Sequence, residues 1–138
     1  MFYGAYDKET ALGESLKCNS HVAHLIGMFR TKRPLRVVDL TLLPNYVSIW
    51  MNNWESVLFL KSFHADIIQP IRDFKENIDY VPSQVFTEYI RWMFRDKDGS
   101  YIDGLVYNSC KTGAKNIVLF CNQKKSSEWL QLDNYSVE

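Results

Sequence analysis

The apolar positions near the start of the chain change their spacing where a strand gives way to a helix. Residues 2–6 are rich in aromatic side chains, which is typical of a short strand. Asp7 follows and has the right side chain to cap a helix over about residues 8–18. The sequence therefore predicts a strand that leads directly into a helix.

Two short apolar segments come next. Residues 21–29 are mostly apolar without a clean period, and residues 35–40 are rich in β-branched side chains. The polar run 31–34, which ends in a proline, separates them. We predict that the two segments pair as a hairpin.

The middle of the chain has the spacing of helices. Between residues 44 and 77 apolar side chains recur at intervals of three and four, with Pro70 at a boundary, so we predict two short helices there. Pro82 suits the first turn of a further helix, which should stop before Asp98. Its apolar stripe consists of Val85, Phe86, Tyr89, Ile90, Met93 and Phe94.

The last part of the chain predicts two strands, at residues 102–107 and 116–120, joined by the polar stretch 108–115. Only the last ten or so residues are interpreted as a tail. The order of elements favours an α+β fold in which helices pack on a mixed sheet, rather than a regular alternation of strands and helices. Residues 1–138 are expected to form a single domain.

Composition narrows the classes of function. Residues are 46% hydrophobic and 23% charged, which is typical of a globular domain, and 16 basic residues balance 16 acidic ones. Nucleic acid is therefore not an expected partner, because its non-specific binding needs an excess of positive charge. The one basic cluster is interpreted as a solvated turn between strands, and it consists of Arg30, Lys32, Arg33 and Arg36.

Cysteine usage and motifs limit the function further. The three cysteines are interpreted as reduced thiols, and we find neither a leader nor an apolar run of the ~18 residues that a membrane span needs, so a soluble cytoplasmic protein is expected. The sequence contains none of the GxSxG, GxxxxGK[ST], GxGxxG and HExxH motifs. The histidines His21, His24 and His64 lack the arrangement of ligands that a metal needs, so no metal is expected.

Several short motifs, in order along residues 1–121, carry a resemblance to a known family. They are Tyr3-x-Ala5, Thr10-Ala11-x-x-Glu14, Asp39-Leu40-Thr41, Tyr80-x-Pro82-Ser83-Gln84, and Asp103-Gly104-Leu105-Val106-Tyr107-x-Ser109 followed by Asn116-x-Val118-Leu119-Phe120. Each motif is weak alone. Together they resemble the RES domain, the NAD-degrading toxin of RES-Xre toxin–antitoxin modules.

The resemblance implies a fold similar to that of ADP-ribosyltransferases and cleavage of NAD, as substrate, by hydrolysis, phosphorolysis or ADP-ribosyl transfer. It also implies a cognate antitoxin protein as partner. Glu14 and Ser109 match the family's glutamate and serine and are the expected catalytic residues. Tyr3 is expected to stack on the nicotinamide, and Gln84 to line the pocket.

The family's arginine lies shortly before the Tyr-x-Ala strand, whereas this chain begins at Met1. We expect that the N-terminal part of the family domain is missing, that the chain is a fragment or a diverged member, and that as printed it cleaves little NAD. The alternative is a truncated, inactive RES fold that serves as a binding module.

Ordinary structural roles remain open for these residues. Outside their motifs, Glu14 would be a solvent-exposed helix residue, Ser109 a turn serine and Tyr3 a core aromatic. The polar side chains of other matched residues are interpreted as caps and turns, and these residues are Asp39, Gln84, Asp103 and Asn116.

Overall fold

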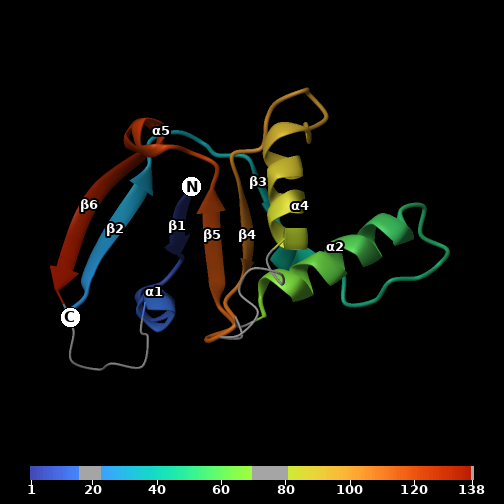
Figure 1. Ribbon diagram of the computed structural model, residues 1–138, viewed down its shortest axis with the longest axis horizontal. Coiled ribbons are helices and arrows are strands. Elements are labelled where there is room, and N and C mark those ends of the chain that lie inside the picture. The colour runs from blue at the N-terminus through green and yellow to red at the C-terminus, as the bar shows by residue number, and fades with distance from the viewer. Residues whose placement is uncertain (16–22, 70–80, 138) are drawn as a thin grey trace.

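The computed structural model describes residues 1–15, 23–69 and 81–137, with the backbone alone for 81–84. Its helices are α1 (Lys8–Ser15), the 3-10 turn η1 (Leu40–Leu42), α2 (Trp54–Ile67), α4 (Val81–Trp92) and α5 (Gln123–Trp129). Its strands are β1 (Phe2–Ala5), β2 (Leu25–Thr31), β3 (Val37–Asp39), β4 (Gly104–Asn108), β5 (Lys115–Leu119) and β6 (Leu130–Val137). Figure 1 shows a central sheet with α2 and α4 on one side and a separate ribbon of β2 and β6 on the other.

The central sheet is mixed, in the order β1-β5-β4-β3. β5 runs antiparallel to both of its neighbours, whereas β3 runs parallel to β4. The two central strands are the most buried, as expected for strands with a neighbour on each side. The helices and this sheet make the fold α+β, as the sequence predicted.

The main core lies where α2 and α4 meet the sheet. Phe63 of α2 and Ile90 of α4 are 5% and 3% exposed. They pack in one cluster with Leu40, Ile102, Leu105, Val118 and Phe120. Burial of these side chains explains why apolar residues recur at helical spacing in the middle of the chain and without interruption in β4 and β5.

The predicted hairpin between residues 21–29 and 35–40 is wrong. β2 pairs instead with β6, antiparallel, and β3 joins β4. The reason is that the chain between β2 and β3 is bound to the start of β4, by contacts described below, so that β3 is carried into the central sheet. The residues interpreted as a tail form β6, whose side chains are mostly exposed and therefore give little apolar signal.

Asp103, just before β4, ties the segment between β2 and β3 to the sheet. It accepts two hydrogen bonds from the guanidinium of Arg33, at 2.7 and 3.0 Å, and one from the backbone amide of Arg36 at 2.9 Å. Burial raises the pKa of this carboxyl, but the hydrogen bonds from Arg33 and Arg36 and the charges of both side chains outweigh burial and lower the pKa. Arg33 also stacks on the ring of Trp129, 4.5 Å from its centroid.

The basic cluster is thus a turn between strands only in part. Arg30 lies within β2 and pairs with Asp133 on β6. Arg33 binds Asp103, and Arg36 pairs with Asp96 and Asp98. These side chains hold neighbouring segments together instead of being merely solvated.

Gly104 shows why a glycine follows Asp103. A Cβ at this position would lie 2.2 Å from the backbone oxygen of Val118 on β5. No side chain fits there, because that oxygen belongs to the rigid ladder between β4 and β5. The close approach of β5 at the start of β4 therefore explains why a glycine follows Asp103 in the motif.

The helix predictions are confirmed where the structure describes them. The Asp7 carboxylate accepts a hydrogen bond from the backbone amide of Thr10 at 2.8 Å and so caps α1 as expected. α4 covers most of the predicted stripe. Of the two helices predicted between residues 44 and 77, α2 is present, and residues 70–80 lie outside the described part of the chain.

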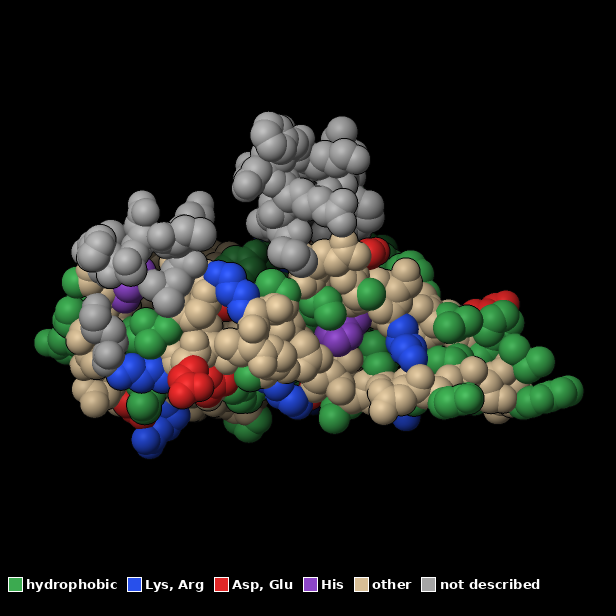
Figure 2. All heavy atoms as spheres, turned by 90° about the horizontal axis from the view of Figure 1, so that it is seen from below, with side chains coloured by type: hydrophobic (Ala, Val, Ile, Leu, Met, Phe, Trp, Pro, Cys, Tyr) green, Lys and Arg blue, Asp and Glu red, His purple; other side chains and the backbone are tan. Residues whose placement is uncertain are grey.

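Exposed apolar side chains gather around α2 and the loop before it. Tyr46 and Trp50 of that loop are 90% and 88% exposed, and Phe59 on α2 is about half exposed. Figure 2 shows apolar side chains (green) at this end of the molecule. Among the described helices, none has the length and apolar character to cross a membrane.

We expect Asp103→Asn to lower the free energy of unfolding at pH 7 by about 2 kcal/mol, because the amide cannot accept all three charge-assisted hydrogen bonds. The folded-state pKa is lowered, so this stabilisation is present above the ordinary value of 3.8 and is lost as pH falls through the folded value. Urea unfolding of wild type and variant from pH 7 to pH 2.5 should show two curves that converge in acid.

Asp133→Asn is the matched control. It removes the carboxylate that pairs with Arg30, whose side chain is 77% exposed, and such pairs contribute about 0–1 kcal/mol. Equal effects of the two substitutions would show that the Asp103 contacts do not hold the β2–β3 segment.

Candidate functional site

The candidate site forms where the end of α1 meets the loop between β4 and β5. The Glu14 carboxylate, on α1, accepts hydrogen bonds from the Ser109 hydroxyl at 2.6 Å and from the Asn116 amide nitrogen at 2.9 Å. Both donors lie about a hundred positions further along the sequence. The structure thus brings together the two predicted catalytic residues, Glu14 and Ser109, and adds Asn116.

The hydroxyl of Ser109 uses both its acceptor and its donor capacity, the first within its own loop and the second on α1. Its oxygen accepts hydrogen bonds from the backbone amides of Lys111 at 3.1 Å and Thr112 at 3.3 Å. Its one hydrogen therefore points to Glu14, because a hydroxyl has a single proton to donate. Ser109 is only 3% exposed, so its contact in this structure is with the carboxylate and not with the open pocket.

The loop that carries Ser109 is a tight turn. The backbone amide of Ser109 donates to the oxygen of Ala114 at 2.7 Å, and that of Gly113 donates to the oxygen of Ser109 at 2.9 Å. Gly113 has a φ of +74°, a conformation that side chains rarely adopt. The glycine in this polar stretch is therefore needed to close the turn that fixes Ser109.

A second set of contacts docks α1 on the same loop. Thr10 is 1% exposed, and its hydroxyl lies 2.9 Å from Asp7 Oδ2 and 2.8 Å from the Thr112 hydroxyl. Lys111 Nζ donates to the backbone oxygen of Gly13 at 2.5 Å. A cation at the last turn of a helix is favourable, because the carbonyl groups there are unpaired and carry partial negative charge. Thr10 of the Thr-Ala-x-x-Glu motif thus fixes the helix that presents Glu14.

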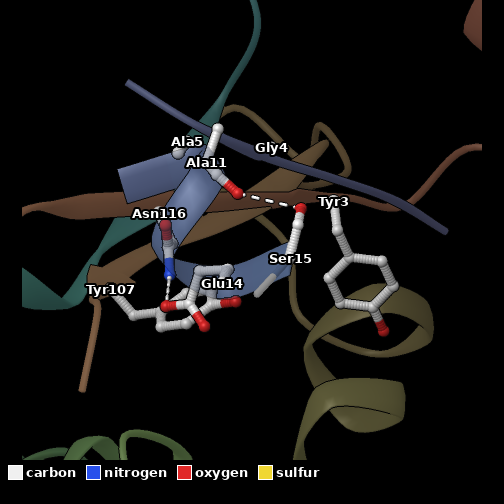
Figure 3. Close-up of a pocket in the computed structure, with 8 residues that line it drawn as sticks. All are labelled: Tyr3, Gly4, Ala5, Ala11, Glu14, Ser15, Tyr107 and Asn116. Carbon is white, nitrogen blue, oxygen red and sulfur yellow. Dashed lines mark hydrogen bonds between the residues drawn. The ribbon is translucent and has the colours of Figure 1, made fainter. Parts of the chain in front are cut away.

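A pocket of about 330 Å³ opens beside the carboxylate (Figure 3). Its lining comprises Tyr3, Gly4, Ala5, Ala11, Glu14, Ser15, Tyr107 and Asn116. In this view Tyr3 and Tyr107 lie on opposite sides of Glu14, and the amide nitrogen of Asn116 points to the carboxylate. The site therefore combines one carboxylate with two aromatic side chains, a combination that suits a ligand with a cationic or electron-poor ring.

Tyr3 and Gln84 were predicted to contact the ligand. Tyr3 is 67% exposed and lines the pocket, so it is not a core aromatic. Gln84 lies in α4, but its side chain is outside the described part of the structure. Its predicted place in the pocket stays a prediction.

Asp39 makes a cap, as the sequence indicated, and Asp103 has a structural role that is neither a cap nor a turn, whereas the side chain of Asn116 contacts Glu14. Asp39 caps η1 through the backbone amide of Thr41 at 2.9 Å, and Asp103 anchors the β2–β3 segment. Asn116 makes neither a cap nor a turn. It lies within β5, where its backbone is paired opposite Ala5 on β1 and Tyr107 on β4, and its side chain contacts Glu14.

Sequence reasoning missed Asn116 because the strand signal of β5 comes from its apolar residues. One signal could have found it: a polar side chain directly before the apolar run 117–119, seven positions after a matched serine. A hairpin with so short a loop brings its two ends together, so residues on either side of the loop become neighbours.

His64, on α2, lies next to the same hairpin. Its Nε2 accepts a hydrogen bond from the backbone amide of Asn108 at 3.4 Å. Burial lowers the pKa of the imidazole, and the nearby Asp39 offsets only part of this effect. The neutral form is therefore favoured, and it fits the accepting role of Nε2. Among the described residues, no group of three His, Cys, Asp or Glu side chains is placed to hold a metal ion.

Comparison with protein families decides the assignment. The family model of the RES domain matches residues 1–133, which is nearly the whole chain. This chain belongs to the RES domain family. Comparison with the curated proteins and with the solved structures gave no match. Within the RES domain, the Glu14 site lies on α1 and on the hairpin of β4 and β5, and both regions contain motifs that carry the resemblance.

We predict that Thr10→Val, which keeps the size of the side chain but removes its hydroxyl, lowers the free energy of unfolding by about 1–3 kcal/mol. Asp7 and Thr112 would each lose a part-buried hydrogen bond to the hydroxyl of Thr10, the buried member of the group. Chemical denaturation measures the loss. Ser15→Ala is the control, since the Ser15 hydroxyl makes an exposed bond to the Ala11 carbonyl. An effect of Thr10→Val no larger than that of Ser15→Ala would contradict the docking of α1 through Thr10.

Proposed function

We propose that this RES domain cleaves NAD at the bond between nicotinamide and ribose, and that Glu14 is the carboxylate that stabilises the transition state. One observation carries the proposal: an exposed carboxylate at a pocket lined by two tyrosines, held in place by buried donors. Membership of the RES family agrees with it.

The chemistry explains why a fixed carboxylate is useful. When the C1′–N1 bond breaks, the electron pair leaves with nicotinamide, and positive charge develops on the ribose ring. A carboxylate beside the ribose is attracted to that charge more strongly in the transition state than in the ground state, so it lowers the barrier. The acceptor, which is water, phosphate or a protein side chain, then bonds to C1′ and releases its proton.

The two tyrosines suit the other part of the substrate. Tyr3 is largely exposed at the pocket and offers a face on which the cationic nicotinamide ring can stack. The Ser109 hydroxyl has a different task from the one the sequence indicated. Because its proton is committed to Glu14 and it is buried, it orients the carboxylate and does not bind the ribose or the amide directly.

The pyrophosphate of NAD needs a cation, and a planar guanidinium is the best suited. No arginine or lysine is among the described residues that line the pocket. This is consistent with the family's arginine lying before the Tyr-x-Ala strand. The assay is therefore best run on the chain extended through any in-frame upstream coding sequence.

We propose further that the domain is toxic when free and is neutralised by a cognate antitoxin protein in the cytoplasm. This follows from the family alone. The second candidate function, a binding module that no longer turns over NAD, is favoured by the absence of a cationic side chain among the described lining residues. Binding of NAD without release of nicotinamide would support it.

We expect Glu14→Gln to reduce nicotinamide release from NAD by about 10²–10³-fold, because the neutral amide no longer stabilises the developing positive charge. The matched control is Glu9→Gln, the same change on an exposed position of the same helix, which should leave the rate unchanged. Circular dichroism would confirm that both variants are folded. Full activity of the Glu14 variant would remove this carboxylate from the mechanism.

A further inference from the structure

The two hydrogen-bond donors on Glu14 meet at the same oxygen atom. Ser109 Oγ and Asn116 Nδ2 both bind Oε1, at 2.6 and 2.9 Å. Oε2 has no hydrogen bond to a described residue. Two donors on one oxygen leave the carboxylate little freedom to rotate, so the oxygen that remains available is fixed as well.

We propose that Asn116 is a positioning residue that acts together with Ser109, holding Oε1 so that Oε2 is the oxygen presented to the pocket. This inference rests on the proposed function for its link to NAD, and on the geometry alone for the arrangement of the carboxylate. It gives a role to a side chain that the sequence motifs suggested was only structural.

The position of Asn116 suits this task. It lies on β5, a central strand paired on both sides, at the register position opposite Ala5 and Tyr107. A side chain on such a strand is held more precisely than one on a loop. Asn116 is also 5% exposed, so its amide is largely shielded from water although Glu14 itself is exposed.

The orientation of the Asn116 amide is dictated by the carboxylate. Turning the amide over would place its oxygen against Glu14 Oε1, and two acceptors repel each other. In the orientation that the carboxylate requires, Asn116 Oδ1 is buried and has no hydrogen-bond partner among the described residues. A buried acceptor that lacks a partner costs stability, and natural proteins contain few of them.

Because of the stability cost of this unpaired acceptor, a positioning role and a structural role for Asn116 predict different effects of its removal. A purely structural asparagine would stabilise the fold, and its removal would lower stability. If Asn116 positions Glu14 instead, an apolar side chain of similar size removes the unpaired acceptor and should therefore cost little stability. The same substitution removes one of the two hydrogen bonds that fix the carboxylate. Residues kept for function at the expense of stability behave in this way.

The decisive variant is Asn116→Leu. We expect a Tm no lower than that of the wild type and a kcat for nicotinamide release reduced about 100-fold, the order of loss that follows from misplacing a reacting group. KM for NAD should change little, because the carboxylate acts mainly in the transition state. A lower Tm with an unchanged kcat would show a structural residue and overturn the proposal.

Asn116→Asp adds a second measurement. It replaces the donor with a carboxylate oxygen close to Glu14 Oε1, so like charges should push Glu14 away and lower kcat at neutral pH. Asn122→Asp is the matched control, since Asn122 caps α5, far from Glu14 in the fold, and aspartate caps helices equally well. An Asn116→Asp variant as active as this control would also overturn the proposal.

A third measurement does not depend on NAD cleavage. The side-chain amide protons of Asn116, observed by NMR in the chain as printed, should move on Glu14→Gln and stay in place on Glu9→Gln. If the extended wild-type chain cleaves no NAD but this shift is seen in the chain as printed, the proposed function fails while the arrangement at Glu14 stands. If the amide protons do not respond to Glu14→Gln, the arrangement itself is wrong.

Discussion

The candidate site depends on the docking of one short helix against one hairpin. α1 is only eight residues long, and a helix of that length is not stable by itself in water. It is held by the Asp7 cap, by the part-buried hydrogen bond between the hydroxyls of Thr10 and Thr112, and by Lys111 at its last turn. Glu14 can be placed precisely only because these contacts fix the helix that carries it.

The same hairpin supplies both the docking surface and the donors. Thr112 and Lys111 hold the helix, while Ser109 and Asn116 hold the carboxylate. A change in the loop would therefore alter the position of the helix and the orientation of the carboxylate together. This coupling joins α1 to the hairpin of β4 and β5, two regions that are distant in sequence and that both carry motifs of the family resemblance.

Local signals in the sequence were sufficient for much of this account. The cap at Asp7, the stripe of α4 and the strands β4 and β5 depend on neighbouring residues and were predicted correctly. The pairing of β2 with β6 was not, because both strands are mostly exposed and the constraint that separates β2 from β3 is a contact between Arg33 and Asp103, 70 positions apart. Glu14 and Ser109 were proposed from their motifs and lie together in the structure, but the contact of Asn116 with Glu14 depends on hydrogen-bond direction and burial, which no spacing records.

The central claim is that Glu14 meets the ribose of NAD through Oε2 while Oε1 stays bound to Ser109 and Asn116. A crystal structure with ADP-ribose in the pocket tests it most directly. We predict a ribose hydroxyl within hydrogen-bond distance of Oε2 and both contacts to Oε1 preserved. A ligand bound away from Glu14, or a carboxylate that has turned from Ser109 and Asn116 to meet it, would contradict the account.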